Sequence, residues 1–235
     1  MTAPTVILLA GGFGTRIKSL HPDLPKPLIP VNGRPFLDWN LRYWQQQGVS
    51  RAVLSLGHLA DVAERYYAMH APADMQIRTV TETIPLGTGG AVLFAAGQGL
   101  SDPFFVGNGD SLVLADLKPA MEWMRRGADG VIVGVEVPDA SRYGTLAAGP
   151  DSRLIGFAEK RPGAGVINAG IYVFRQRVFE EFPDRQPLSM ETDVFPALLK
   201  AGADLRVTSV RAPFLDIGTP DSLAQAEAFI QTHFA

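Results

Sequence analysis

The chain has 235 residues, of which 46% are hydrophobic and 19% are charged, and its formal net charge is −3. This length and composition are typical of a folded protein with one large or two small domains, and they exclude an intrinsically disordered chain. An acidic balance argues against a general nucleic-acid binder, and the lack of cysteine excludes disulfides and thiolate metal sites.

The start of the chain carries no signal for export or membrane insertion. Its apolar run, residues 6–10, has no basic residue before it and has glycines directly after it. Signal peptides and membrane spans need longer apolar runs. Because a chain without cysteine also suits a reducing compartment, we expect a cytoplasmic protein with no membrane partner.

Short apolar runs and helical patterns alternate along the chain. The expected strands are 5–10, 51–56, 75–81, 104–107, 129–137, 144–147, 154–159, 167–174 and 205–209. The expected helices are 36–47, 59–70, 87–96, 117–126, 176–182, 191–200 and 221–232. Strand–helix alternation in the first half predicts an α/β fold with a mostly parallel sheet and helices on both faces. The clustered strands between residues 129 and 174 predict antiparallel additions to the same sheet.

The loop after the first expected strand is rich in glycine and in positive charge. Between Gly11 and Arg34 it holds four cations and one anion, Asp23, in a chain of net charge −3. Ligands of parallel α/β sheets bind at the carboxyl ends of strands, where this loop lies. Glycine N–H groups can surround an anion, Arg16 can donate to two phosphate oxygens, and Lys26 between two prolines supplies a point charge. The pattern therefore predicts a phosphate-binding loop, and the alternative is a surface loop with solvated charges.

Two familiar glycine motifs do not fit this loop. The dinucleotide-binding fingerprint requires a glycine where the chain has Ile17, and the Walker motif has no match anywhere. A dinucleotide-dependent oxidoreductase is therefore a weaker alternative than a phosphate-binding enzyme of another kind.

Two aspartates follow apolar runs that are far apart in the sequence. Asp110 ends the segment 107–110, which is either a tight Asn-Gly hairpin turn or an aspartate presented at the end of a strand. Asp216 lies three residues before Thr219, which precedes Pro220 as a helix N-cap would. Asp216 alone would be structural, whereas the two carboxylates together would suit Mg²⁺, which binds one or two carboxylates plus substrate phosphates.

Two further segments have both a functional and a structural interpretation. Glu159 and Lys160 end an expected strand shortly before Asn168, and by default they form an exposed ion pair. Residues 82–90 open an expected helix, and their structural interpretation is a capped helix start with flexible glycines. The four histidines show no spacing typical of metal ligands.

Taken together and in this order, the motifs resemble the sugar-phosphate nucleotidyltransferase family. They occupy residues 9–16, 25–28, 86–90, 108–110, 159–160, 168–172 and 216–220. Each motif alone is weak, but the ordered set is specific and covers residues 5 to about 228. The variant loop before Lys26, with residues 32–37 and 85–91, is most similar to the D-glycero-D-manno-heptose 1-phosphate guanylyltransferases.

This family joins a nucleoside triphosphate to a sugar 1-phosphate and releases pyrophosphate. The resemblance implies its fold, a Rossmann-like twisted sheet that carries an antiparallel sugar-binding extension. It implies one domain over residues 1–235, with a nucleotide-binding half at about 1–115 and a sugar-binding half at about 116–235. It also implies Mg²⁺ as cofactor, and it leaves a homo-oligomer open because relatives often form dimers or tetramers.

The resemblance also assigns roles to individual residues. The residues expected to act in catalysis are Arg16, Lys26, Asp110, Lys160 and Asp216. Those expected to bind the nucleotide are Leu9, Ala10, Gly11, Gly12, Gly14, Thr15, Arg16, Lys26, Glu82, Gly87, Thr88 and Asn108. Those expected to bind the sugar phosphate are Asp110, Tyr143, Gly144, Glu159, Lys160, Asn168 and Ala169. Asp110 and Asp216 would hold Mg²⁺, and Lys160 would bind the phosphate of the sugar 1-phosphate.

Glu82 matches the family position that faces the nucleobase. Guanine presents a ring N–H beside an exocyclic amine, and these two adjacent donors suit one carboxylate better than the edge of any other base. We therefore expect GTP as donor, with D-glycero-D-manno-heptose 1-phosphate as acceptor. The alternatives are that Glu82 only caps the nearby helix, that UTP or CTP is used with a hexose or N-acetylmuramic acid 1-phosphate, or that the chain is a non-catalytic nucleotide-sugar-binding module.

Overall fold

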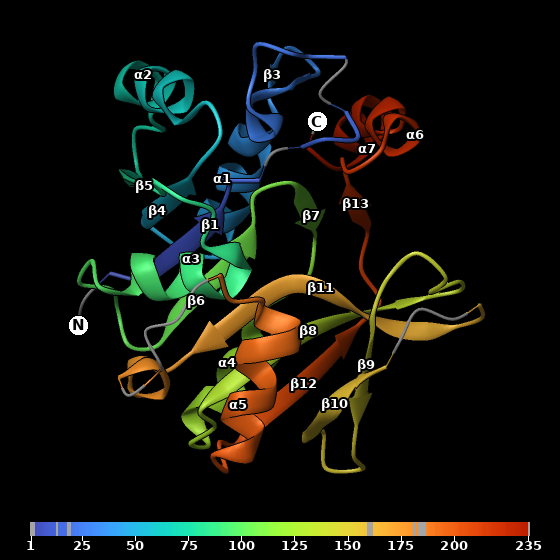
Figure 1. Ribbon diagram of the computed structural model, residues 1–235. Coiled ribbons are helices and arrows are strands. Elements are labelled where there is room, and N and C mark those ends of the chain that lie inside the picture. The colour runs from blue at the N-terminus through green and yellow to red at the C-terminus, as the bar shows by residue number, and fades with distance from the viewer. Residues whose placement is uncertain are drawn as a thin grey trace.

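The computed structural model describes residues 3–12, 14–17, 20–158, 162–180, 182 and 187–234 (Figure 1). The strands of its main sheet are β1 (Thr5–Leu9), β4 (Arg51–Leu56), β5 (Gln76–Thr81), β6 (Phe104–Asn108), β8 (Gly130–Val137), β9 (Thr145–Ala148), β10 (Leu154–Ala158), β11 (Gly165–Phe174) and β12 (Leu205–Val210). Two smaller ladders pair β2 (Pro30–Val31) with β3 (Arg34–Pro35), and β7 (Ser111–Val113) with β13 (Phe214–Asp216). The helices are α1 (Phe36–Gln46), α2 (Ala60–His70), α3 (Gly87–Ala96), α4 (Lys118–Arg125), α5 (Phe195–Lys200), α6 (Pro220–Ala224) and α7 (Ala226–His233).

The main sheet has the strand order β10-β9-β11-β6-β1-β4-β5, and β8 and β12 continue it from β11. Strands β6, β1, β4 and β5 are parallel, so their carboxyl ends meet at one edge. β11 runs antiparallel to β6 and to β8, and β9 runs antiparallel to β10 and β11. The expected α/β fold, parallel in its first half with antiparallel additions from residues 129–174, is therefore confirmed.

Helices cover both faces of the sheet, as the alternating pattern predicts. In β1, Val6 and Leu8 are buried against the core that contains α1, α2, α4 and α7. Ile7 points the other way, into the core that contains α3 and α5, the two helices that face the viewer in Figure 1. A strand that is buried on both faces is typical of the centre of a parallel sheet.

A bulge in β11 positions residues beside the end of β6. The strand pairs with β6 from Phe174 back to Ile171, and its register with β8 shifts between Ile171 and Asn168. Before the bulge, Ile167 pairs with Thr145 of β9 instead. The strand therefore leaves β6 where β6 ends, and residues 168–170 lie at the functional edge of the sheet.

Several expected elements differ from the observed ones. The helix expected at 176–182 is a 3₁₀ turn, η2 (Gln176–Phe179), and the helix expected at 191–200 begins as a π-helical turn, η3 (Met190–Val194). The helix expected at 221–232 is split into α6 and α7. The N-cap expected at Thr219 is confirmed, and a capping box with Ser222 strengthens it.

The Asn-Gly hairpin considered for residues 107–110 is wrong. β7 follows directly after Asp110, but it pairs with β13 and not with β6. Neither β7 nor β13 was expected, because each has three residues and too few positions for a periodic pattern. Within the described ranges, no helix is long and apolar enough to cross a membrane.

Candidate active site

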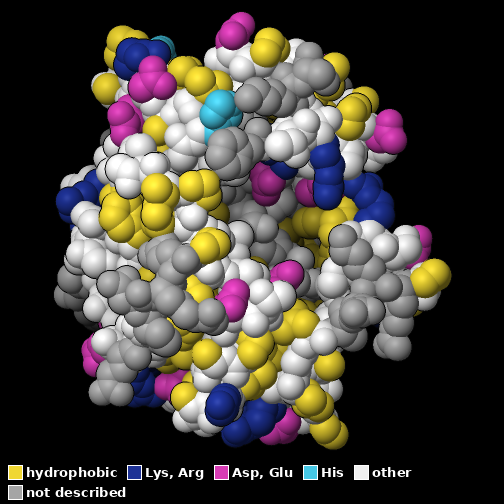
Figure 2. Space-filling model, in the orientation of Figure 1, with side chains coloured by type: hydrophobic (Ala, Val, Ile, Leu, Met, Phe, Trp, Pro, Cys, Tyr) yellow, Lys and Arg dark blue, Asp and Glu magenta, His cyan; other side chains and the backbone are white. Residues whose placement is uncertain are grey.

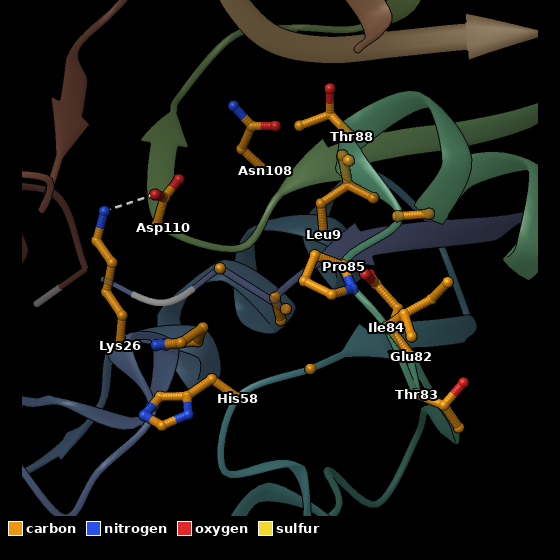
Figure 3. A pocket seen from close by; sticks show the side chains of 17 residues that line it. Leu9, Lys26, His58, Glu82, Thr83, Ile84, Pro85, Thr88, Asn108 and Asp110 are labelled. Atoms are coloured by element: carbon orange, nitrogen blue, oxygen red, sulfur yellow. Dashed lines mark hydrogen bonds and ion pairs between the residues drawn. The ribbon is translucent and has the colours of Figure 1, made fainter. Parts of the chain in front are cut away.

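A cavity of about 520 Å³ lies at the carboxyl ends of β1, β4, β5 and β6 (Figure 3). Most of the residues predicted to bind a nucleotide line it, together with Asp110. These are Leu9, Ala10, Gly11, Gly12, Lys26, Glu82, Gly87, Thr88 and Asn108. In Figure 3, Lys26 and Asp110 lie at one end of the cavity, and Glu82, Ile84 and Pro85 lie at the other.

Other lining residues were missed by the sequence analysis. Gly57 and His58 follow β4, and Thr83, Ile84 and Pro85 follow Glu82 at the end of β5. Gly57 and His58 belong to no motif, and residues 83–85 lie in the segment 82–90 but were assigned no role in binding; each group follows a parallel strand at the same edge. The rule that ligands bind at the carboxyl ends of parallel strands would have identified them.

Part of the glycine loop lies outside the cavity wall. Gly14, Thr15 and Arg16 do not line the cavity, and Arg16 is exposed to solvent. Ile17 is buried and anchors this part of the loop. Gly14 has a φ of 57°, and a Cβ atom there would lie 3.1 Å from Cβ of Lys26. Gly14 thus allows the loop to pack against the Lys26 stem, and a phosphate role for Arg16 stays a prediction.

The floor of the cavity is formed by closely packed backbone. A Cβ atom on Gly57 would lie 2.6 Å from the carbonyl oxygen of Gly11, and one on Gly11 would lie 3.0 Å from Oε1 of Glu82. A side chain at either glycine would push the β1 and β4 loops apart. The glycines therefore allow two neighbouring loops to meet beneath a ligand.

Glu82 caps the nearby helix and also lines the cavity. Its Oε2 accepts the N–H of Leu86 at 3.0 Å, and its Oε1 accepts the Ser55 hydroxyl at 3.3 Å. Leu86 is the N-cap residue of α3, so Glu82 makes a hydrogen bond at the start of this helix. Recognition of a base by the same carboxylate stays a prediction.

The glycines at the start of α3 provide close packing, and this corrects their interpretation as flexible residues. Gly87 has a φ of 73°, and a Cβ atom there would lie 2.4 Å from the carbonyl oxygen of Leu188. Gly89 donates its N–H to the same oxygen at 2.8 Å. Thr88 Oγ1 accepts the N–H of Met190 at 2.9 Å. The start of α3 is therefore bonded to the segment that leads into η3.

Lys26 and Asp110 form an ion pair at the edge of the cavity. Nζ of Lys26 lies 2.6 Å from Oδ2 of Asp110, with side-chain exposures of 12% and 39% (Figure 3). Lys26 opens the short 3₁₀ turn η1 (Lys26–Leu28), whose N-cap is Pro25. Prolines on both sides restrict the backbone of Lys26, so its side chain enters the edge of the cavity from a fixed direction.

Asp216 lies next to Asp110 because β13 pairs with β7. Asp216 is opposite Ser111 in this ladder, and the N–H of Ile217 donates to the carbonyl oxygen of Asp110 at 3.0 Å. Oδ1 of Asp216 accepts the N–H of Gly218 at 2.9 Å, which orients the carboxylate. Two residues more than 100 positions apart in the sequence thus form one acidic site.

The Tyr143 hydroxyl donates to Oδ2 of Asp216. Burial, followed by the hydrogen bond and the charge of Asp216, raises the pKa of Tyr143 to about 12. The phenol therefore remains a donor at neutral pH. Tyr143 was expected to contact the sugar, and the bond observed here is to the carboxylate expected to bind metal.

The two carboxylates fit a hard divalent cation that also binds substrate phosphates. Among the described residues, no group of three or more His, Asp or Glu side chains forms a complete metal site. Mg²⁺ does not need one, because it commonly takes one or two carboxylates, water and phosphate oxygens. The adjacent backbones of Asp110 and Asp216 are consistent with such a shared site.

The predicted sugar-binding residues are connected by hydrogen bonds. The N–H of Asn168 donates to the carbonyl oxygen of Gly144 at 3.2 Å. Oδ1 of Asn168 accepts the N–H of Gly170 at 3.1 Å, and Ala169 between them is buried. Gly170 lies against Asn108, since a Cβ atom added to Gly170 would be 2.2 Å from Nδ2 of Asn108.

The remaining predicted residues, Glu159 and Lys160, lie outside the described residues. The contacts of Asn168 and Gly170 bring Asn108, Gly144 and Asn168 together at the end of β6. Their roles in sugar binding stay predictions.

Comparison with known proteins agrees with this geometry. The family model for nucleotidyl transferase matches residues 5–233. A mannose-1-phosphate guanylyltransferase from Mycobacterium tuberculosis is 35% identical over 94% of this chain, which spans 63% of that longer protein. A D-glycero-alpha-D-manno-heptose 1-phosphate guanylyltransferase from Aneurinibacillus thermoaerophilus is 33% identical, over 96% of this chain and 97% of the relative. The structure of HddC from Yersinia pseudotuberculosis complexed with GMP-PN superimposes with a TM-score of 0.85 at 36% identity, covering 96% of this chain and 98% of that one.

Proposed function

The chain belongs to the nucleotidyl transferase family, and from this premise we propose that it transfers GMP from GTP to D-glycero-D-manno-heptose 1-phosphate and releases pyrophosphate. The observation that carries the proposal is the cavity at the carboxyl ends of the parallel strands, in a chain that matches a GMP-PN-bound relative over nearly its full length. Two relatives named as D-glycero-alpha-D-manno-heptose 1-phosphate guanylyltransferases are 33% and 30% identical over 96% and 92% of this chain, which supports this acceptor.

The two ends of the cavity suit the two ends of a nucleotide. Ile84 and Pro85 supply apolar surface beside the Glu82 carboxylate, where a base would stack and pair with a hydrogen-bond acceptor. Lys26 lies at the other end and supplies positive charge for the phosphates. A guanine base offers two adjacent donors to a carboxylate, so the geometry favours GTP over UTP and CTP.

The reaction needs positioning and charge neutralisation rather than a general base. A phosphate oxygen of the sugar 1-phosphate attacks the α-phosphorus of GTP in line, and pyrophosphate leaves. The attacking phosphate is already ionised at pH 7, so no proton must be removed from it. Two anions must approach each other, and Lys26 offsets part of their repulsion.

We assign Mg²⁺ to the carboxylates of Asp110 and Asp216. When bound, the ion would neutralise charge on the reacting phosphates. The Asp110 carboxylate contacts Lys26, and the Asp110 carbonyl oxygen accepts the N–H of Ile217, the neighbour of Asp216. The acidic pair therefore lies beside the phosphate end of the cavity. Arg16 and Lys160 would add positive charge at the reacting phosphates.

A second acceptor, mannose 1-phosphate, is favoured by the relative from Mycobacterium tuberculosis. Pyrophosphate release should be measured for GTP, UTP, CTP and ATP with heptose, mannose and glucose 1-phosphates. The proposal expects GTP to be preferred by about 10- to 100-fold in kcat/KM, the penalty for a carboxylate left facing the wrong base. Equal or better use of UTP would reject it.

The wider setting of the enzyme is also part of the proposal. It would act in the cytoplasm as one domain over residues 1–235, with GTP and sugar 1-phosphate as its partners and without nucleic acid or membrane. A homo-oligomer is compatible with this reaction, and light scattering of the purified protein measures that state directly.

A further inference from the structure

A carboxylate that no sequence motif identified, Glu191, lies at the sugar side of the site. It belongs to η3, whose N-cap is Ser189. The Ser189 hydroxyl accepts the N–H of Glu191 at 3.2 Å, and the Ser189 N–H donates to Oδ2 of Asp193 at 2.9 Å. This double bonding fixes the backbone from which the Glu191 side chain extends. π-helical turns occur often at functional sites.

The Glu191 carboxylate is exposed but not freely rotating. Its Oε1 accepts a hydrogen bond from Nδ2 of Asn168 at 2.8 Å. The same Nδ2 donates to the hydroxyl of buried Tyr172 at 3.0 Å. Among the described residues, no group donates a hydrogen bond to the other carboxylate oxygen. Because Asn168 orients the carboxylate through Oε1, this second oxygen is held in place and is accessible to a ligand.

Asn168 connects Glu191 to both parts of the reaction site. Its Oδ1 accepts from Gly170, which lies against Asn108 in the cavity wall. Its N–H donates to Gly144, which follows the Tyr143 that holds Asp216. The carboxylate is therefore linked through Asn168 and Gly170 to Asn108 in the cavity wall.

The same segment is fixed to the nucleotide pocket from the other side. Met190, the neighbour of Glu191, donates its N–H to Thr88 at the start of α3. Figure 2 shows a hollow in the middle of this face, with acidic side chains at its upper and lower margins. A sugar joined to the α-phosphate would occupy this hollow.

We propose that Glu191 is a specificity-determining residue that accepts hydrogen bonds from hydroxyl groups of the sugar 1-phosphate. The inference rests on the proposed function and deepens it. A carboxylate accepts hydrogen bonds only, and a pyranose presents donating hydroxyls around its ring. Asn168 holds one oxygen and leaves the second for the sugar. Glu191 thus selects hydroxylated sugars and disfavours those with an anionic substituent at the same position.

The test uses Glu191→Gln, which keeps the shape and one acceptor, and Glu191→Ala, which removes the contact. The probes are α-D-mannose 1-phosphate, whose ring configuration the heptose shares, and its 2-, 3-, 4- and 6-deoxy analogues. Glu191→Ala should raise KM for mannose 1-phosphate by about 10- to 100-fold, the usual cost of a lost charged hydrogen bond. The KM for GTP should change less than about 2-fold, since that ligand lies in the other pocket.

One deoxy analogue should give equal KM values with the wild type and with Glu191→Ala, because the hydroxyl and its acceptor form one interaction. Glu180→Gln is the matched charge control. Glu180 is exposed and directly follows Phe179, whose ring contacts Phe174, and Phe174 pairs with Phe104 at the opposite end of β6. It should leave both KM values unchanged.

An unchanged KM for mannose 1-phosphate in Glu191→Ala would overturn the inference. Equal losses with every deoxy analogue would also overturn it, because they would indicate a structural role. If the wild type prefers UTP or CTP, the proposed function fails, but the same comparison run with that nucleotide still decides the role of Glu191.

Discussion

Replacement of Lys26 by methionine should separate the catalytic role of this side chain from its structural one. The variant keeps the aliphatic stem that packs on Gly14 and removes the charge that lies 2.6 Å from Asp110. Asp110 is 39% exposed, so water can solvate its carboxylate after the substitution. We expect a stability loss of about 1 kcal/mol, the upper end for an exposed pair, which corresponds to a fall in Tm of roughly 2–4 °C in a chain of this length.

The effect on turnover should be much larger. In the proposed reaction the lysine faces the position where phosphate charge accumulates, and loss of one such group costs about 10²- to 10³-fold in kcat. Pyrophosphate release and thermal unfolding, measured on the same preparation, compare the two effects. Lys118→Met is the control, because Lys118 is exposed at the start of α4. Turnover within about 3-fold of wild type, or a Tm loss large enough to unfold the protein under assay conditions, would refute the reasoning.

Three further changes test the acidic site and the packing beneath the nucleotide. Asp216→Asn should lower turnover by about 100-fold with the fold intact, and EDTA should abolish wild-type activity; full activity in EDTA would exclude the metal. Tyr143→Phe should lower turnover by about 10-fold as its hydrogen bond to Asp216 is lost, and it should remove a phenol that ionises near pH 12 in an ultraviolet titration. Since that pKa is raised, the stability that Tyr143 contributes is complete below about pH 10 and is lost as the pH rises toward 12. Gly87→Ala should lower Tm by roughly 4–8 °C, because a left-handed φ and a Cβ atom 2.4 Å from Leu188 together cost at least about 2 kcal/mol; an unchanged Tm would contradict this packing.

The parts of the fold that local patterns encode were predicted well. β1 is an apolar run followed at once by glycines, and α1 ends before Gly48, so both are recognisable without knowledge of their neighbours. The nucleotide cavity follows from them, because the parallel order brings the loops after β1, β4 and β6 to one edge. Local sequence and a general rule of topology were sufficient here.

The parts that depend on distant pairing were not predicted from local patterns, and only the family resemblance placed Asp110 and Asp216 in one Mg²⁺ site. β7 and β13 have three residues each, and their pairing alone brings Asp216 beside Asp110. Glu191 acquires a role only because the β11 bulge turns Asn168 toward it. Such contacts have no sequence periodicity, so local patterns do not identify them.

The β7–β13 ladder also determines when the site can be completed during synthesis. All the described residues that line the cavity lie between Leu9 and Asp110, so they leave the ribosome early. The second carboxylate of the acidic pair, Asp216, is made about 100 residues later, and its strand then finds a partner that is already in place. Because chains emerge from the N-terminus at about 5–20 residues per second, the residues of the nucleotide-binding wall are synthesised several seconds before Asp216. The nascent chain therefore passes through a stage in which it contains every described residue of the cavity wall but lacks Asp216 and the residues 188–190 that hold the start of α3.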